Sequence, residues 1–203
     1  MDIKRDFYLS KLINRIGNGQ VKVITGVRRC GKSFLLNTLF YDYLLENDVS
    51  DDHIIKFAFD SAEDLALIGE DIVKLQKENR KADPKKFMNY IKSRCVDNGK
   101  YFLLLDEVQL MDSFESVLNG YLRKRNIDLF VTGSNAKFLS KDIITEFSGH
   151  GDEIHMYPLS FSEFMSFFQG DKYEGLSQYM TYGGIPLVVL SQDNGDKADL
   201  LAN

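Results

Sequence analysis

A short glycine loop near the start of the chain carries residue types and a spacing suited to phosphate chemistry. The segment GVRRCGKSF at residues 26–34 fits the pattern G-x-x-x-x-G-K-[ST] at every fixed position. Glycines lack a Cβ that would obstruct the turn, so backbone N–H groups can surround a phosphate, and the helix that follows adds its positive end. We therefore expect Lys32 to contact the β- and γ-phosphates of a nucleoside triphosphate and Ser33 to hold Mg²⁺. The expected nucleotide-binding residues are Gly26, Val27, Arg28, Arg29, Cys30, Gly31, Lys32, Ser33 and Phe34.

Two adjacent acids end a second informative segment, YFLLLDEVQ at 101–109. A buried apolar strand rarely ends in two acids for stability alone, although an acidic turn is the structural alternative. Neighbouring residues on a strand point to opposite sides, so Asp106 and Glu107 should differ in role. We expect Asp106 to help hold Mg²⁺, usually through a water molecule, and Glu107 to orient and polarise an attacking water.

A polar segment, VTGSN at 131–135, ends the next apolar run. The Asn135 amide can both donate and accept hydrogen bonds, so at a strand end beside Glu107 it could hold the attacking water or contact the γ-phosphate. Ser134 and Asn135 also suit a turn or a helix N-cap, which is the structural interpretation.

Alternating strands and helices must position these segments. Apolar runs predict strands at 21–26, 53–60, 101–108, 128–135 and 153–159. Helical patterns occupy 6–16, 33–47, 84–99, 112–126, 136–149 and 161–168, with a helix and a connection at 61–82. This alternation requires crossover connections, so we expect an α/β fold: a three-layer P-loop NTPase core with a five-stranded, mainly parallel sheet, followed by a partial helical domain. The core is expected at 1–160 and the second, truncated domain at 161–203.

Composition and charge restrict the classes of partner. The 203 residues carry a net charge of −5, which predicts no overall attraction to nucleic acid or to anionic membranes, although a local basic patch stays open. No apolar run approaches the length of a membrane helix, and the first residues lack the apolar centre of a signal peptide. The two cysteines, Cys30 and Cys95, favour a reduced cytoplasmic protein, and no zinc-ligand spacing is present.

The chain resembles the AAA-type group of P-loop ATPases. More narrowly, GVRRCGKS, LLLDEVQ, VTGSNAKFLS, YPLSFSEF and YGGIP resemble a family of bacterial and archaeal ATPases whose members carry a C-terminal winged-helix and nuclease-like region. The resemblance implies ATP as the nucleotide. It assigns Lys32 and Ser33 to Walker A, Asp106 and Glu107 to Walker B, and Asn135 to sensor 1. The second domain would then be a helical lid or winged-helix domain. The resemblance leaves open a homo-oligomer, and a nucleic-acid partner through the C-terminal region missing from this sequence.

One residue departs from the pattern of that family. Where Ser-Gly-Arg is expected, the chain has Ser148, Gly149 and His150. AAA-type ATPases place an arginine finger in this region, aimed at the γ-phosphate of a neighbouring subunit. Histidine is shorter and mostly neutral near pH 7, so His150 at this trans finger position would weaken hydrolysis. The alternative is that the expected arginine is only a surface or core partner.

These residues together predict an Mg²⁺-dependent ATPase that converts ATP and water to ADP and phosphate. A GTPase would need N-K-x-D and D-x-x-G motifs, and neither occurs in the sequence. A small-molecule kinase would need an arginine-rich lid, but no arginine follows Arg125. The remaining alternative is a switch or assembly module that binds ATP and hydrolyses little of it.

Overall fold

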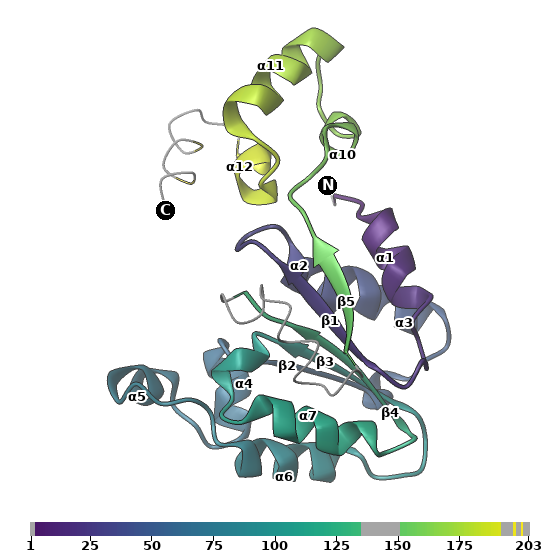
Figure 1. Cartoon of the computed structure of the whole chain (residues 1–203), viewed down its shortest axis with the longest axis vertical. Coiled ribbons are helices and arrows are strands. Elements are labelled where there is room, and N and C mark those ends of the chain that lie inside the picture. Colours follow the sequence, from purple (N-terminus) through teal and green to yellow (C-terminus); the bar gives the residue numbers. More distant parts are fainter. Residues whose placement is uncertain (1–2, 135–150, 192–196, 198–199, 201–203) are drawn as a thin grey trace.

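A five-stranded parallel sheet forms the centre of the computed structural model, which describes residues 3–134, 151–191, 197 and 200. The strand order is β2-β3-β4-β1-β5, and all four pairings are parallel (Figure 1). The strands are β1 (Val21–Gly26), β2 (Ile54–Ala58), β3 (Tyr101–Asp106), β4 (Ile127–Thr132) and β5 (Gly151–Met156). The predicted α/β P-loop NTPase fold is therefore confirmed, and the carboxyl ends of β1, β3 and β4 lie side by side.

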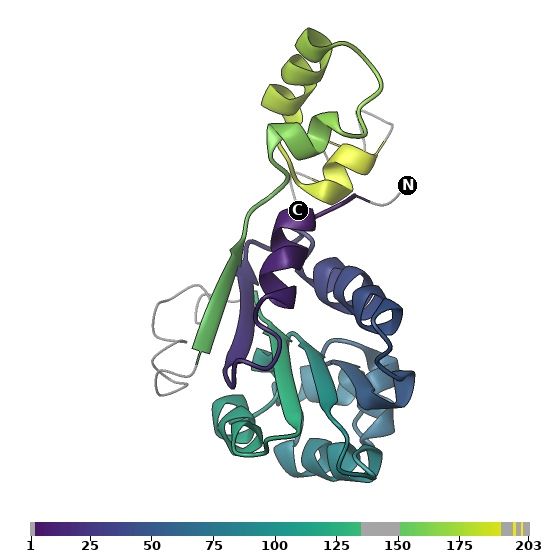
Figure 2. The same cartoon turned by 90° about the vertical axis from the view of Figure 1, so that its right-hand side faces the viewer.

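Helices cover both faces of the sheet because the strands carry apolar side chains on both faces. On β3, Leu103 and Leu105 pack toward one face, and Phe102 and Leu104 toward the other. Figure 2 shows the helices on opposite sides of the sheet, which makes the three layers. One layer holds α4 (Ala62–Leu67), α5 (Ile72–Lys77), α6 (Pro84–Arg94) and α7 (Phe114–Leu122). The other holds α1 (Asp6–Ile13), α2 (Lys32–Phe34), the π-helix η1 (Leu35–Phe40) and α3 (Tyr41–Glu46).

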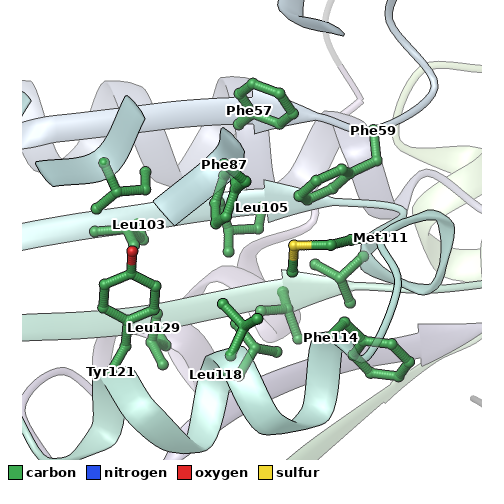
Figure 3. Close-up of a cluster of buried hydrophobic side chains, with 14 of the residues drawn as sticks. Phe57, Phe59, Phe87, Leu103, Leu105, Met111, Phe114, Leu118, Tyr121 and Leu129 are labelled. Atoms are coloured by element: carbon green, nitrogen blue, oxygen red, sulfur yellow. The ribbon is translucent and has the colours of Figure 1, made fainter. Parts of the chain in front are cut away.

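The larger apolar cluster, which packs between the sheet and helices α4 to α7, holds in place the strand ends that carry the polar side chains. Figure 3 shows aromatic and aliphatic side chains from the strands meeting those of α6 and α7. Val108 and Met111, from the segment directly after β3, are fully buried in this cluster. Leu105 of β3 is buried in the same cluster, so the chain is anchored on both sides of Glu107.

A buried polar cluster lies at the opposite, amino-terminal end of the sheet. Lys22 of β1 is fully buried, and its Nζ forms an ion pair with Asp128 of β4. The second oxygen of Asp128 accepts a hydrogen bond of 2.7 Å from the Gly17 N–H and lies 3.3 Å from Lys100 Nζ. Burial lowers the pKa of Lys22, while the Asp128 carboxylate acts in the opposite direction.

The boundaries of several predicted elements were wrong. The segment 61–82 forms two short helices, α4 and α5. Helix α6 ends at Arg94, before the predicted end at Gly99. Here the Asp97 carboxylate accepts the Gly99 N–H at 2.7 Å, and the Tyr101 hydroxyl accepts the Val96 N–H at 3.1 Å. These side chains offer the backbone partners outside a helix, so the helix stops earlier.

A small group of helices follows β5. Helix α10 (Phe161–Met165) begins with a capping box, in which Ser160 and Glu163 satisfy each other's backbone N–H groups. Helices α11 (Lys172–Tyr182) and α12 (Pro186–Leu190) pack nearby, beyond the carboxyl end of β5 (Figures 1 and 2). Within the described part of the chain, every helix is too short or too polar to cross a lipid bilayer.

Candidate functional site

Both fixed glycines of the loop are required by the backbone. Gly26 ends β1 with a φ of 143°, and a Cβ there would overlap the Met156 carbonyl oxygen of β5. Gly31 has a φ of 99° and immediately precedes α2. Arg29 also has a positive φ, 67°, which is strained for a residue with a side chain. The loop therefore holds an unusual conformation between β1 and α2, the context the sequence pattern requires.

Replacing Gly26 with alanine should destabilise the protein by about 3 kcal/mol or more, because backbone strain and overlap with Met156 add together. The Gly19→Ala variant is a matched control, since Gly19 also has a positive φ (74°) but its added Cβ would meet no neighbouring atom within 4 Å. We expect it to lose only about 1 kcal/mol. Urea denaturation of both variants measures the difference. Equal losses of stability in Gly26→Ala and Gly19→Ala would contradict an added contribution from overlap with Met156.

Lys32 and Ser33 lie together at one side of a cavity of about 490 Å³. Lys32 is only 5% exposed, and its Nζ donates hydrogen bonds to the Gly26 and Val27 carbonyls at 3.2 and 3.1 Å. Ser33 is exposed. Glu107 lines the same cavity, so the structure brings together the loop and the predicted water-activating acid.

Asp106 is oriented by two side chains from neighbouring elements. It is buried at the end of β3, and its Oδ1 accepts a hydrogen bond from the Thr132 hydroxyl at the end of β4. Its Oδ2 accepts one from Asn37 Nδ2 at 3.2 Å, while Asn37 Oδ1 is buried without a hydrogen bond. Asn37 lies in the π-helix η1, a form that is frequent at functional sites. Asn37 and Thr132 together hold the Asp106 carboxylate in place.

Glu107 does not continue β3, so the prediction that it and Asp106 lie on opposite sides of one strand was wrong. Its φ of 52° turns the chain out of the sheet. Its N–H donates to the Thr132 hydroxyl at 3.1 Å, so Thr132 fixes both acids. The Glu107 carboxylate accepts hydrogen bonds from Gln109 Nε2 and, at 2.8 Å, from the Ser134 hydroxyl.

A third carboxylate, missed at the sequence level, lies at the same end of the sheet. Partial desolvation and then the negative charge of Asp106 raise the pKa of Asp60, which follows β2. Asn37, Thr132 and Gln109 were also missed. A signal existed for Asn37, which lies four residues after Ser33 and thus on the same helical face, and for Thr132, which ends its apolar strand.

The remaining predicted residues lie in different surroundings. Arg28 lines the cavity, and Arg29 donates a hydrogen bond of 3.1 Å to the Leu200 carbonyl. The Cys30 side chain is buried in the apolar cluster beneath the loop, and burial raises the pKa of its thiol. Asn135 and His150 lie outside the described residues.

The donor set suits a hard cation beside phosphate. Ser33 and Asp106 offer a hydroxyl and a carboxylate, and oxygen ligands of this kind are those that Mg²⁺ prefers. Lys32 and the loop N–H groups offer positive charge and hydrogen-bond donors to an anion. The fold and this constellation define a P-loop protein.

The chain belongs to the AAA domain family, which matches residues 18–165. An uncharacterized protein of Haemophilus influenzae is 33% identical over 197 residues, which cover 94% of this chain and 46% of that protein. An uncharacterized protein of Methanocaldococcus jannaschii is 27% identical over 215 residues, covering 98% of this chain and 42% of the relative. This chain thus spans less than half the length of both relatives.

A solved structure agrees with this assignment at the level of the fold. A Walker-type ATPase of Pyrococcus abyssi superposes with a TM-score of 0.62 at 15% sequence identity. The match covers 99% of this chain and 71% of the other.

Proposed function

We propose that this AAA domain binds ATP with Mg²⁺ and hydrolyses it to ADP and phosphate. The observation that carries the proposal is the cavity of about 490 Å³ that Lys32, Ser33 and Glu107 line together. This cavity combines hydrogen-bond donors for a triphosphate with a carboxylate that can accept a proton. Membership of the AAA domain family supports the same activity.

The residues would divide the chemistry as follows. The loop N–H groups and Lys32 hold the phosphate oxygens, and Ser33 and Asp106 hold the metal. Mg²⁺, when bound, neutralises charge on the phosphates. Glu107 accepts a proton from the water whose oxygen attacks the γ-phosphorus, and the bond to the bridging oxygen of ADP breaks. Asn135 would assist at this water. His150, at the trans finger position, would act less strongly than an arginine.

The apolar wall of the cavity suits a nucleobase. Opposite the loop, it is formed by the N-terminal segment and α12, with Ile3, Pro186, Leu187 and Leu190. Phe34 adds an aromatic ring from the end of α2. Such a surface buries a planar base by apolar contact, as ligand pockets generally do.

The first test is the affinity for Mg·ATP, measured by calorimetry with wild type and Lys32→Ala. Loss of the buried ammonium should weaken binding by up to about 100-fold, because a charge-assisted hydrogen bond contributes roughly 1.5–3 kcal/mol. Lys77→Ala, which removes an exposed lysine of α5, serves as the control. Wild-type protein that binds no Mg·ATP, or a Lys32 variant that binds as tightly as the control, would refute the proposal.

A second candidate function is an ATP-binding switch with little hydrolysis. The favouring observation is that the Glu107 carboxylate already accepts hydrogen bonds from Gln109 and Ser134, which compete with a water molecule for it. Phosphate release on the sample used for binding separates the two functions. Tight binding with a turnover no different from that of Glu107→Gln would favour the switch.

Larger assemblies are a further part of the proposal. We propose that residues 1–160 form the ATPase core and 161–203 the start of a helical lid or winged-helix domain. On this view the chain is part of a longer cytoplasmic protein of the ATPase family with a C-terminal nuclease-like region. A homo-oligomer and a DNA partner would follow from that membership. Gel shifts at low and high salt with the longer protein test the nucleic-acid partner.

A further inference from the structure

Arg5 is a buried arginine at the point where the N-terminal segment meets the loop and the helices after β5. It precedes α1 and is only 2% exposed. A guanidinium is always charged, so its burial is unfavourable unless its donors find partners. The partners of Arg5 come from three separate segments of the chain.

Two of these partners are backbone carbonyls. Arg5 Nη1 donates to the Cys30 carbonyl at 3.3 Å, and Nη2 donates to the Tyr157 carbonyl at 2.6 Å. The guanidinium also lies over the Tyr8 ring, 4.7 Å from its centre, and the Tyr8 hydroxyl accepts the Tyr157 N–H at 3.1 Å. Arg5 therefore ties the glycine loop to the end of β5.

The third partner is Glu163, whose two oxygens have separate tasks. Oε1 lies 3.0 Å from Arg5 Nε, and the pair is largely shielded from water. Oε2 accepts the Ser160 N–H at 2.8 Å and the Ser160 hydroxyl at 2.9 Å, which caps α10. One carboxylate thus connects the start of α10 with the guanidinium that contacts the loop.

The contact with Cys30 bears on phosphate binding through peptide geometry. The Cys30 carbonyl and the Gly31 N–H belong to one peptide unit, which is planar and trans, so the two groups point in opposite directions. Holding the carbonyl on Arg5 therefore fixes the direction of the Gly31 N–H. Gly31 lines the cavity beside Lys32.

We propose that Arg5 is a positioning residue that holds the glycine loop in its binding conformation and, through Glu163, couples nucleotide binding to helix α10. The coupling rests on the proposed ATP binding, whereas the effect on the loop does not. Arg5 itself also lines the cavity, but its effect on the loop acts through the Cys30–Gly31 peptide.

The experiment compares Arg5→Met with Arg15→Met. Arg15 follows the same helix α1 and pairs with Asp152 of β5 at 2.8 Å, at the end of that strand remote from the loop. Hydrogen–deuterium exchange of the nucleotide-free proteins should be faster in loop residues 27–31 of Arg5→Met only. The dissociation constant for Mg·ATP should rise about tenfold in Arg5→Met and stay within about twofold in Arg15→Met.

Glu163→Gln tests the link to α10. Glutamine can still cap the helix but lacks the charge that pairs with Arg5. In wild type and Arg15→Met, Mg·ATP should slow exchange in α10, and in Arg5→Met and Glu163→Gln this slowing should be lost. A merely structural Arg5 would lower the stability of the fold but leave the affinity of the folded protein unchanged.

Two results would overturn the inference. The first is unchanged loop exchange in nucleotide-free Arg5→Met, which would refute the positioning role even if the wild type bound no ATP. The second is wild-type ATP affinity in Arg5→Met, which would refute the inference while leaving the proposed function intact. A wild type that binds no ATP would instead refute the proposed function and the coupling with it.

Discussion

Replacing Glu107 with glutamine is expected to lower the rate of ATP hydrolysis about 10³-fold, within the usual range for loss of a general base. Glutamine has nearly the same shape but cannot accept a proton from water. The affinity for Mg·ATP should change little, because Lys32, Ser33 and Asp106 remain. The measurement is phosphate release at saturating Mg·ATP, with calorimetric binding on the same sample.

Asp112→Asn is the matched control for this change. Asp112 is an exposed acid five residues further along the chain, so its replacement makes the same change in charge. It should leave both rate and affinity near wild type. Should Glu107→Gln and Asp112→Asn release phosphate equally fast, Glu107 would not be the base, and the ATP-binding switch would become the better description.

Replacing Asp128 with leucine is expected to lower the free energy of unfolding by about 3–5 kcal/mol. The change leaves the fully buried Lys22 ammonium without its ion-pair partner and the Gly17 N–H without its acceptor. Lys22 would keep weaker partners: the Gln20 carbonyl at 3.0 Å, the Asn18 side chain at 3.3 Å and the Phe130 ring, whose centre lies 4.6 Å away. Urea denaturation at neutral pH measures the loss.

Two further measurements test whether the unpaired charge of Lys22 causes the loss of stability: its pH dependence and a double variant. Burial lowers the pKa of Lys22, so the folded protein releases this proton at a lower pH than the unfolded chain does. The loss in Asp128→Leu should therefore be largest below the lowered pKa of Lys22 and shrink as the pH rises through that pKa. The double variant Lys22→Met, Asp128→Leu should regain the stability lost to the unpaired charge, since an apolar pair replaces the ions, and keep only the smaller loss from the Gly17 N–H without its acceptor. A double variant as unstable as the single one would contradict this account.

The fold and the two main motifs could be predicted from sequence because each is local. The glycine loop, the apolar run of β3 and the acids after it are all contiguous, and parallel strands bring their carboxyl ends together. Contacts between distant residues could not be predicted in this way. Arg5 and Tyr157, for example, are separated by 152 positions, and no periodicity indicates that they meet.

Backbone conformation set a second limit on prediction. Glu107 has a positive φ, which residues with side chains rarely adopt, so its sequence neighbours favoured a continued strand. The π-helix η1 was equally hidden, since an α-helix and a π-helix share the same apolar pattern over one turn. Both deviations occur where the site is built, as strain often does.

The position of β1 between β4 and β5 determines when the glycine loop can take its shape during synthesis. Gly26 pairs with Met156 of β5, and Ile24 pairs with Thr132 of β4. The first strand therefore leaves the ribosome long before the two strands that flank it. Such distant pairings close slowly, because the chain entropy is lost before the contacts form. The nascent chain thus carries an unformed nucleotide loop until β5 has emerged, which makes closure of the sheet the step that creates the binding site.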